Sequence, residues 1–452
     1  MSEKKGSERY AKYVNPQWVK LLDLLGMDVQ YERCLGTELF PVKGDPILDF
    51  LSGFCVYNAG HNHPAIIAAL KDELDKNGPL MLQSHVPELA GVAAQRLCRH
   101  AGGSMERVFF TSSGSEGVET AIKFSRAYTK RNSILYCDGA FHGLTCGARA
   151  LMGDPFWKEG FGPMMQATEA IPFNDLEALE EKLSTKKFAA FMLEPVQSEA
   201  GIKLPKGGYL TEVQRLCRRY GTLFVLDEVQ TGIYRTGSFL AGQHYGVEPD
   251  MVILAKAMSG GLVPVGAVLM TQAISDSVFS SLKRAIIHAS TFGENALAMR
   301  VVLATLDVLE AEKWGEKSAA AGEMFRKRLG EVLAPYEMFK EVRGLGMLSG
   351  IEWQSPKRLS LKVPFELFKK IHPGMFGQIL VMHLFHEKKI LTQICGNNFM
   401  VLKVAPPLIA TSEQLDCFVK AIAETAEMIH TSGRFWTDAI SMVGHAVKAG
   451  AI

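Results

Sequence analysis

Lys256 is the residue whose type and position most directly suggest chemistry. It follows the apolar run 251–255, which is typical of a buried strand, and precedes the flexible turn 259–261. Burying an ammonium group without a partner costs several kcal/mol. That cost is understandable if the lysine is used chemically, because a desolvated lysine has a lowered pKa and can form a Schiff base with a carbonyl.

Asp227 supplies the second half of the same chemistry. It ends another apolar run, 223–226, upstream of Lys256. A lysine that binds an aldehyde and an aspartate that keeps a pyridinium nitrogen protonated are the minimum that a protein must offer to pyridoxal 5'-phosphate. The pair therefore predicts an enzyme that uses this cofactor.

A run of small polar residues, Ser113, Gly114 and Ser115, follows the predicted strand 108–110 and opens a predicted helix. The free N–H groups and the positive dipole end of a helix start attract anions. These residues are therefore predicted to hold the cofactor phosphate. The alternative is ordinary helix capping by Ser113 or Ser115.

Other candidate cofactor contacts follow further strands, where ligands of doubly wound sheets bind. Phe141, after the run 133–136, could stack on the pyridine ring or be a packed core aromatic. His142 is either a structural hydrogen-bonding residue or a direct participant in catalysis. Val229 is predicted to cover the opposite ring face, and Gln230 to donate a hydrogen bond to the ring's phenolic oxygen.

Two glutamates follow the apolar run 188–193. Glu194 ends a buried strand, where a carboxylate needs a partner, and is predicted to organise the neighbouring loops. Glu199 lies further out, where it could pair with a cation and gate the entrance.

These residues are predicted to be positioned by a mainly parallel sheet. Apolar runs without polar alternation are typical of strands buried on both faces, and the helical segments 116–130 and 208–220 would supply crossovers. The predicted strands are 108–110, 133–136, 188–193, 223–226, 251–255 and 265–270.

The chain of 452 residues is long enough for more than one core. Three parts are expected: an arm and part of a small domain (1–75), a large cofactor-binding domain (76–335) and a C-terminal small domain with a helical tail (336–452). The flanking parts are predicted to contain strands near 46–52, 339–352 and 390–407 and helices at 64–76, 412–430 and 431–452.

Composition excludes several classes of protein. The formal net charge is +1, so neither a nucleic-acid footprint nor a polybasic membrane anchor is indicated. No apolar run is long enough to span a bilayer, and residues 1–6 lack the apolar stretch of a secretory signal. The eight cysteines have no metal-ligand spacing and are expected to be reduced thiols, which favours a cytoplasmic protein without a metal site.

Taken together, the motifs resemble those of the class III aminotransferases, which include the ornithine, acetylornithine, putrescine and 4-aminobutyrate aminotransferases. The resemblance runs from about residue 15 to 430, and the segment from Asp227 to Lys256 is its most specific part. The matching segments are 60–64 (GHNHP), 110–116 (FTSSGSE), 141–143 (FHG), 194–197 (EPVQ), 226–232 (LDEVQTG), 254–256 (LAK) and 290–292 (STF).

The resemblance implies a fold-type-I pyridoxal-phosphate transferase that forms a homodimer with shared active sites; a tetramer is compatible with it. It also implies that Thr291 reaches the partner's cofactor phosphate, that Phe54 lines the substrate pocket, and that Glu199 is a gate residue that pairs with a carboxylate-binding arginine.

Two positions depart from the family's ornithine branch. Lys403 stands before the Pro406-Pro407 pair, where an arginine usually binds the substrate α-carboxylate, and Leu144 replaces an arginine after the Phe-His-Gly motif. Lysine offers a point charge and not a bidentate fork. Both departures predict a more apolar site, open to a bulkier amine or one poor in carboxylates.

The expected function is the ping-pong transfer of an amino group from a terminal amine to a 2-oxo acid. Ornithine, lysine, diamines and larger lipid-like or aromatic amines stay open as donors, and 2-oxoglutarate or pyruvate as acceptors. Two alternatives keep the same scaffold, namely a racemase or aminomutase and a non-catalytic binding protein.

Overall fold

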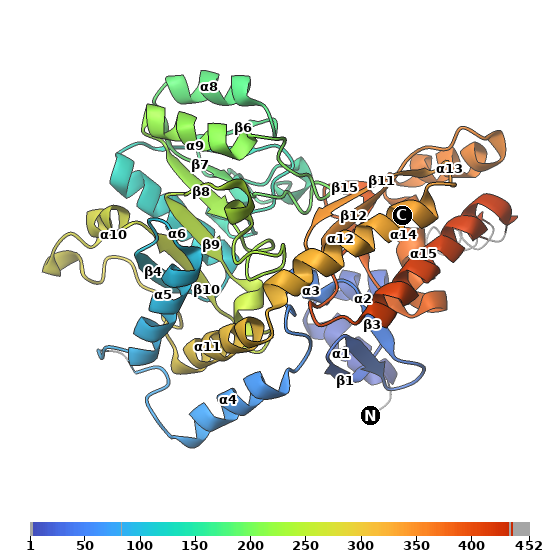
Figure 1. The fold of residues 1–452 in the computed structure, drawn as a ribbon, viewed down its shortest axis with the longest axis horizontal. Helices are drawn as coiled ribbons and strands as arrows, with labels where there is room; N and C mark the ends of the chain where they lie inside the picture. The colour runs from blue at the N-terminus through green and yellow to red at the C-terminus, as the bar shows by residue number, and fades with distance from the viewer. Residues whose placement is uncertain (1–2, 83, 434, 437–452) are drawn as a thin grey trace.

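A seven-stranded sheet dominates the computed structural model, which describes residues 3–82, 84–433 and 435–436 (Figure 1). Its strand order is β4-β10-β9-β8-β7-β5-β6. The strands are β4 (Arg107–Thr111), β5 (Ser133–Cys137), β6 (Thr168–Ile171), β7 (Phe188–Leu193), β8 (Leu223–Asp227), β9 (Met251–Leu254) and β10 (Gly266–Met270).

The sheet is mainly parallel, as predicted. Strands β6, β5, β7, β8 and β9 run parallel to one another, whereas β10 is antiparallel to both β9 and β4. All six predicted strands are present, and β6 is an additional edge strand. The fold class expected from the sequence is thereby confirmed.

Helices cover both faces of this sheet, which explains the continuous apolar runs. On β8, Val225 packs in the core on the side of α6 (Gly114–Thr129). Its neighbours Phe224 and Leu226 pack on the opposite side, with α8 (Leu176–Ser184) and α9 (Tyr209–Tyr220). Successive side chains of a strand point to opposite faces, so each must be apolar.

Two four-stranded sheets are built from the flanking parts of the chain. One has the order β1-β2-β3-β13, in which β13 of the C-terminal part pairs parallel with β3 of the N-terminal part. The other has the order β11-β12-β15-β14. The strands are β1 (Tyr31–Leu35), β2 (Glu38–Pro41), β3 (Ile47–Asp49), β11 (Phe339–Leu345), β12 (Leu348–Trp353), β13 (Ile390–Leu391), β14 (Gln393–Cys395) and β15 (Asn398–Val404).

The predicted terminal helices α4 (Pro64–Asp75) and α15 (Ser412–Thr431) are present. Helix α12 (Trp314–Leu333) crosses between the seven-stranded sheet and the β11-β12-β15-β14 sheet (Figure 1). Most of the predicted tail helix 431–452 lies outside the described residues. The three-domain division itself stays a prediction.

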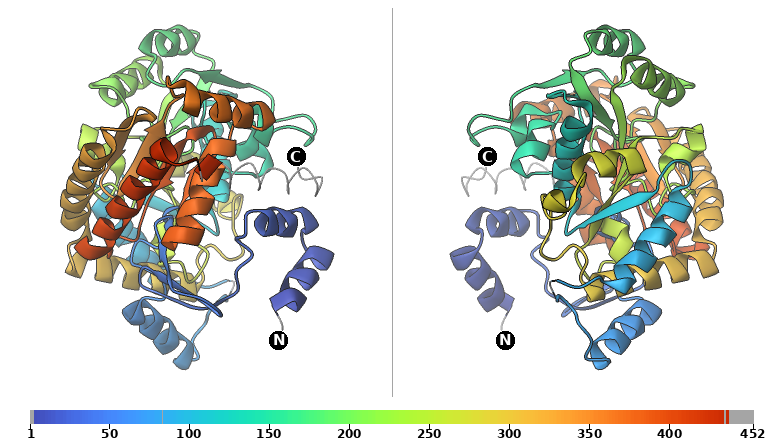
Figure 2. Two further views of the ribbon diagram at one scale, coloured as in Figure 1. Left: turned by 90° about the vertical axis from the view of Figure 1, so that its right-hand side faces the viewer. Right: turned by 90° about the vertical axis from the view of Figure 1, so that its left-hand side faces the viewer.

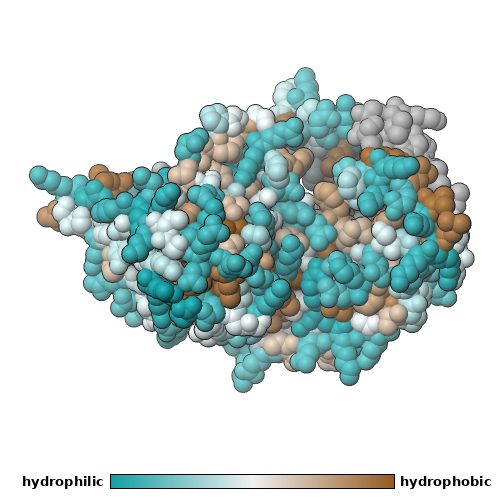
Figure 3. Space-filling model, turned by 90° about the horizontal axis from the view of Figure 1, so that it is seen from above, coloured by the Kyte–Doolittle hydropathy of each residue, from teal (hydrophilic) through white to brown (hydrophobic). Residues whose placement is uncertain are grey.

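The N-terminal helices α1 (Glu3–Tyr13) and α2 (Pro16–Leu24) project away from the body of the molecule (Figure 2). They expose Tyr13 and Trp18. The face seen in Figure 3 is mostly hydrophilic, with scattered apolar patches. Among the described helices, none is long and apolar enough to cross a membrane.

Candidate active site

A cavity of about 470 Å³ lies where β4, β5, β7, β8 and β9 end. Side chains from five separate strand exits meet there, as expected of a doubly wound sheet. The predicted site residues that line it are Ser113, Gly114, Ser115, Phe141, His142, Glu194, Asp227, Val229, Gln230 and Lys256.

Lys256 begins a short 3-10 helix, Lys256–Ser259, directly after β9 and Ala255. Its φ is 47°, in the left-handed region that a residue with a side chain seldom adopts. Burial lowers the pKa of Lys256. In the described part of the chain, no carboxylate lies within ion-pair distance of its ammonium.

Asp227 is held by two contacts in its buried position. One carboxylate oxygen lies 2.8 Å from His142 Nδ1, and the other accepts the Val229 N–H at 3.1 Å. Burial by itself would lower the pKa of His142, but Asp227 raises it. This geometry favours the hydrogen-bonding role of His142, since the ring fixes the orientation of the carboxylate.

The start of α6 supports both interpretations of the small polar run. Ser113 Oγ accepts the Glu116 N–H at 3.3 Å, and the Glu116 side chain accepts the Ser112 N–H at 2.9 Å, so the helix is capped. Gly114 lies against Val229, where an added Cβ would be 2.9 Å from a valine methyl. Ser113, Gly114 and Ser115 line the cavity, so the positive end of the helix lies where an anion in the cavity would be attracted.

Glu194 and Phe141 belong to one arrangement. Glu194 accepts the Phe141 N–H at 3.0 Å, and burial raises the pKa of Glu194 to about 7. The Phe141 ring packs edge-on against Trp157, with ring centroids 5.2 Å apart. Trp157 in turn donates to Asn397 at 2.8 Å. Neither Trp157 nor Asn397 was predicted, because Trp157 ends a short 3-10 helix, Pro155–Trp157, and Asn397 lies in the turn between β14 and β15, so neither directly follows a predicted strand.

Glu199 and Lys403 form a buried ion pair, and Lys403 has no exposed surface. Glu199 Oε1 also accepts from Gln230 at 3.1 Å, and Oε2 accepts the Gly396 N–H at 2.9 Å. Burial would raise the pKa of Glu199, but Lys403 and these donors lower it to about 2. Burial would lower the pKa of Lys403, and Glu199 raises it.

The remaining predicted residues do not line the cavity. The Phe54 ring centroid is 5.1 Å from Lys403 Nζ. Leu144 is 43% exposed beside the lining residue Gly143. Thr291 lines a separate hollow with residues 79–82 and 84–89. Their predicted roles in binding substrate or a partner's cofactor stay predictions.

The residues present fit pyridoxal phosphate. A partly buried lysine, an oriented carboxylate and an open helix start share one cavity. Two buried polar atoms beside them, His142 Nε2 and Gln230 Oε1, have no partner among the described residues. The described residues contain no cluster of histidine, cysteine or carboxylate side chains that could hold a metal ion.

Comparison with known proteins gives a family. Residues 25–426 match the family model described as Aminotransferase class-III. The chain is 34% identical to aminotransferase PigE of a Serratia species over 94% of its own length, but it spans only about half (53%) of PigE. It is 31% identical to the putrescine aminotransferase of Pectobacterium atrosepticum, over 97% of this chain and 91% of that protein.

Solved structures that resemble this fold are also aminotransferases. The ornithine aminotransferase of Toxoplasma gondii ME49 superposes with a TM-score of 0.83 at 29% identity, covering 95% of this chain and 96% of the other. A transaminase from a marine Virgibacillus superposes with a TM-score of 0.80 at 25% identity, over 89% of this chain and 93% of the other. These relatives extend over nearly the whole described fold.

Proposed function

The chain belongs to the class III aminotransferases, which are pyridoxal-phosphate-dependent transaminases, and from this premise we propose that it moves an amino group from a terminal amine to a 2-oxo acid. Both substrates would use the same cavity in turn, in a ping-pong order. The proposal is supported by the convergence of Lys256 and Asp227 in one cavity.

Each residue around the cofactor would have a separate task. Lys256 would hold the aldehyde, Asp227 would keep a proton on the ring nitrogen, and the start of α6 near Ser113 would bind the phosphate. Phe141 and Val229 would enclose the ring from opposite faces. When bound, the cofactor supplies an electron sink for a carbanion next to the amine nitrogen.

Lys256 would also be the base of the reaction. With the cofactor and the substrate bound, the Lys256 Nζ would take the proton from the carbon that carries the amino group. The lowered pKa of Lys256 favours the neutral amine that this role needs. The His142 ring would keep the Asp227 carboxylate oriented throughout.

The proposed class of amino donor rests on the lining of the cavity, which contains no arginine among the described residues. An arginine fork is the usual partner of a carboxylate, and the Lys403 charge is already paired with Glu199. Apolar side chains form much of the wall, from Val56, Val196, Leu262, Val263 and Val265. These features favour a donor whose reacting end is a carboxylate-free primary amine with an apolar or diamine body.

The acceptor must bind differently, because a 2-oxo acid carries a carboxylate. Release of Lys403 by Glu199 would provide one positive charge for the carboxylate of the acceptor.

We further propose a homodimer, in which exposed Thr291 approaches the cofactor phosphate of the partner subunit. The putrescine and ornithine aminotransferases among the relatives are consistent with diamine-type donors.

The test is a half-reaction. Purified protein loaded with pyridoxal phosphate is mixed with putrescine, ornithine, lysine or a long-chain alkylamine, without acceptor, while the visible absorption of the cofactor is followed. The expected result is loss of that absorption and release of an aldehyde, reversed by 2-oxoglutarate or pyruvate. Lys256→Ala is the control and should show neither change.

The alternative function, an isomerase on the same scaffold, predicts a different outcome. A racemase or aminomutase would rearrange its substrate with no net conversion of the cofactor and no need for a 2-oxo acid. Isomerised amino acid without aldehyde release would therefore replace the proposed activity. Failure of the whole amine panel to change the absorption would contradict the terminal-amine donor.

A further inference from the structure

A tight turn at residues 197–203 carries Glu199. Gln197 and Lys203 close its base with two backbone hydrogen bonds of 3.1 Å, and the Ser198 carbonyl accepts the Gly201 N–H at 3.4 Å. Glu199 lies within the turn, so its carboxylate moves wherever the turn moves. The position of this turn therefore determines whether Glu199 can meet Lys403 and Gln230.

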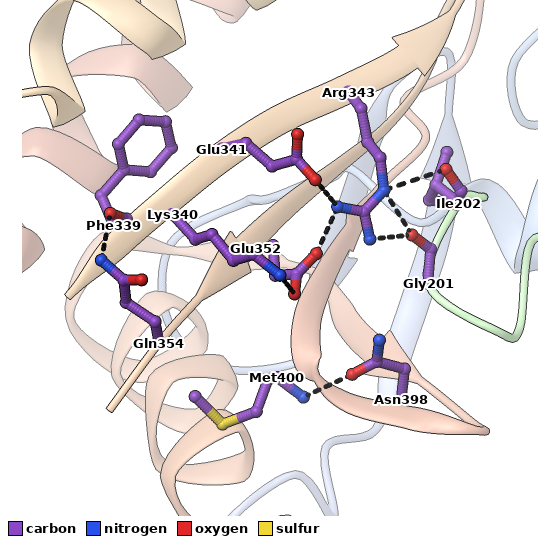
Figure 4. A network of polar contacts seen from close by, with 10 residues as sticks. All are labelled: Gly201, Ile202, Phe339, Lys340, Glu341, Arg343, Glu352, Gln354, Asn398 and Met400. Atoms are coloured by element: carbon purple, nitrogen blue, oxygen red, sulfur yellow. Dashed lines mark hydrogen bonds and ion pairs between the residues drawn. The ribbon is translucent and has the colours of Figure 1, made fainter. Parts of the chain in front are cut away.

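Arg343, from β11, donates hydrogen bonds to backbone carbonyls of this turn (Figure 4). Its Nε donates to the Gly201 carbonyl at 2.9 Å and to the Ile202 carbonyl at 3.2 Å, and its Nη2 donates to Gly201 again. Its Nη1 donates to Glu341 and Glu352. One planar side chain thus joins the turn after β7 to neighbouring strands of another sheet.

Two carboxylates beside Arg343 stabilise its contact with the turn. Its side chain is only 16% exposed, and the two carbonyls it binds are neutral, so Glu341 and Glu352 must balance the cation. Burial would raise the pKa of Glu352, but Lys340 and Arg343 hold it below its usual value. Glu352 is therefore ionised at neutral pH and keeps the guanidinium aimed at the turn.

Packing leaves the turn little room. Gly201 has a φ of 106°, and an added Cβ would lie 2.8 Å from Asn398 Nδ2 and 3.2 Å from Arg343 Nη2. In addition, the Glu199 carbonyl accepts the Asn397 N–H at 2.9 Å. The turn is thus clamped between Arg343 and the β14–β15 connection.

We propose that Arg343 is a positioning residue for Glu199, and that it sets the preference between carboxylate-free and carboxylate-bearing amines. With the turn clamped, Glu199 neutralises Lys403, and the site favours a substrate tail without a carboxylate. When the clamp loosens, Glu199 leaves Lys403 more often, and the free ammonium attracts carboxylates. Only this consequence for preference rests on the proposed function.

The direct test is amide hydrogen exchange of the 197–203 segment in the cofactor-loaded protein. Arg343→Gln is expected to raise exchange there about tenfold, because hydrogen bonds from a charged donor are lost. Arg343→Lys should lie in between, since a point charge cannot serve all four partners. Lys340→Gln is the matched control, because it removes a cation from Glu352 but touches no atom of the turn. Wild-type protection of 197–203 in both Arg343 variants would overturn the clamp.

The second test is a double-mutant cycle with Glu199→Gln. The measured quantity is kcat/KM for a carboxylate-free amine divided by that for an ω-amino acid. Arg343→Gln should lower this ratio about tenfold in the parent protein and leave it unchanged in the Glu199→Gln background. An equal drop in both backgrounds would mean that Arg343 does not act through Glu199. If no amine converts the parent protein's cofactor, the proposed function fails, and hydrogen exchange alone decides the clamp.

Discussion

Lys403→Met tests the buried ion pair between Lys403 and Glu199, which contacts the cavity-lining residue Gln230. Methionine has a similar length but no charge, so the change leaves the Glu199 carboxylate buried without its cation. Lys403 has no exposed surface, and water cannot easily replace it. The structure therefore predicts a loss of stability and not only a change in substrate preference.

The size of the loss follows from Glu199. Its pKa falls from an ordinary 4.5 to about 2 in the folded protein, although burial alone would raise it. At about 1.4 kcal/mol per pKa unit, this corresponds to about 3 kcal/mol. Removing one partner of a buried pair generally costs about 3–5 kcal/mol, in the same range.

The pH dependence has a definite sign. In the parent protein the pKa of Glu199 is lowered on folding, so its stabilisation is complete above pH 4.5 and is lost as the pH falls towards 2. In Lys403→Met, burial without the cation should raise this pKa instead. The deficit of the variant should then be largest near pH 7 and shrink as the pH falls and Glu199 takes up a proton.

The assay is urea unfolding of the cofactor-loaded proteins at pH 7 and at pH 5. Glu199→Gln/Lys403→Met is the control, because the double change removes the unpaired charge while the amide can still bond to Gln230 and Gly396. It should recover most of the loss. A Lys403→Met protein as stable as the parent, or a double variant no more stable than Lys403→Met, would refute the reasoning.

Three further changes probe the cofactor site. Lys256→Ala should reduce amino transfer at least about 10²–10⁴-fold with an unchanged circular dichroism spectrum, because it removes the base; substantial turnover in the loaded variant would contradict that role. Asp227→Asn should lose most turnover yet retain the cofactor after dialysis, and parental turnover would exclude its role at the ring nitrogen. Gly114→Ala should weaken cofactor binding about tenfold in a fluorescence titration, because the new methyl group would lie 2.9 Å from Val229. Gly78→Ala is the control and should leave cofactor binding unchanged, because a Cβ at Gly78 has no other atom within 4 Å.

Sequence reasoning located most of the large sheet because burial on both faces leaves a continuous apolar run. The strand that it missed, β6 (Thr168–Ile171), is an edge strand in which only Ile171 is buried, so its run is not apolar. The direction of β10 was also not readable. An antiparallel strand covered on both faces has the same composition as a parallel one.

The cofactor residues were predictable because each follows a strand, and the ends of parallel strands meet at one edge. Contacts between distant loops were not. The resemblance implied that Glu199 pairs with a carboxylate-binding arginine, and Lys403 stands where the ornithine branch carries such an arginine. The residues alone did not show that these two side chains, 204 positions apart, form a buried ion pair. Arg343 was not predicted, since it binds the turn through backbone carbonyl groups, which every residue has.

The distribution of charge around the cavity accounts for the chemistry expected of Lys256. The negative charge of Asp227 is shared with His142, and that of Glu199 with Lys403. Burial raises the pKa of Glu194 to about 7, which reduces its negative charge at neutral pH. Each nearby carboxylate is therefore paired or partly protonated. Glu199 and Asp227 raise the pKa of Lys256, but they do not outweigh the desolvation of its ammonium, which lowers this pKa. Releasing Glu199 from Lys403 would free both a cation and an anion near Lys256, so the ion pair that sets substrate preference also bears on the basicity of the catalytic amine.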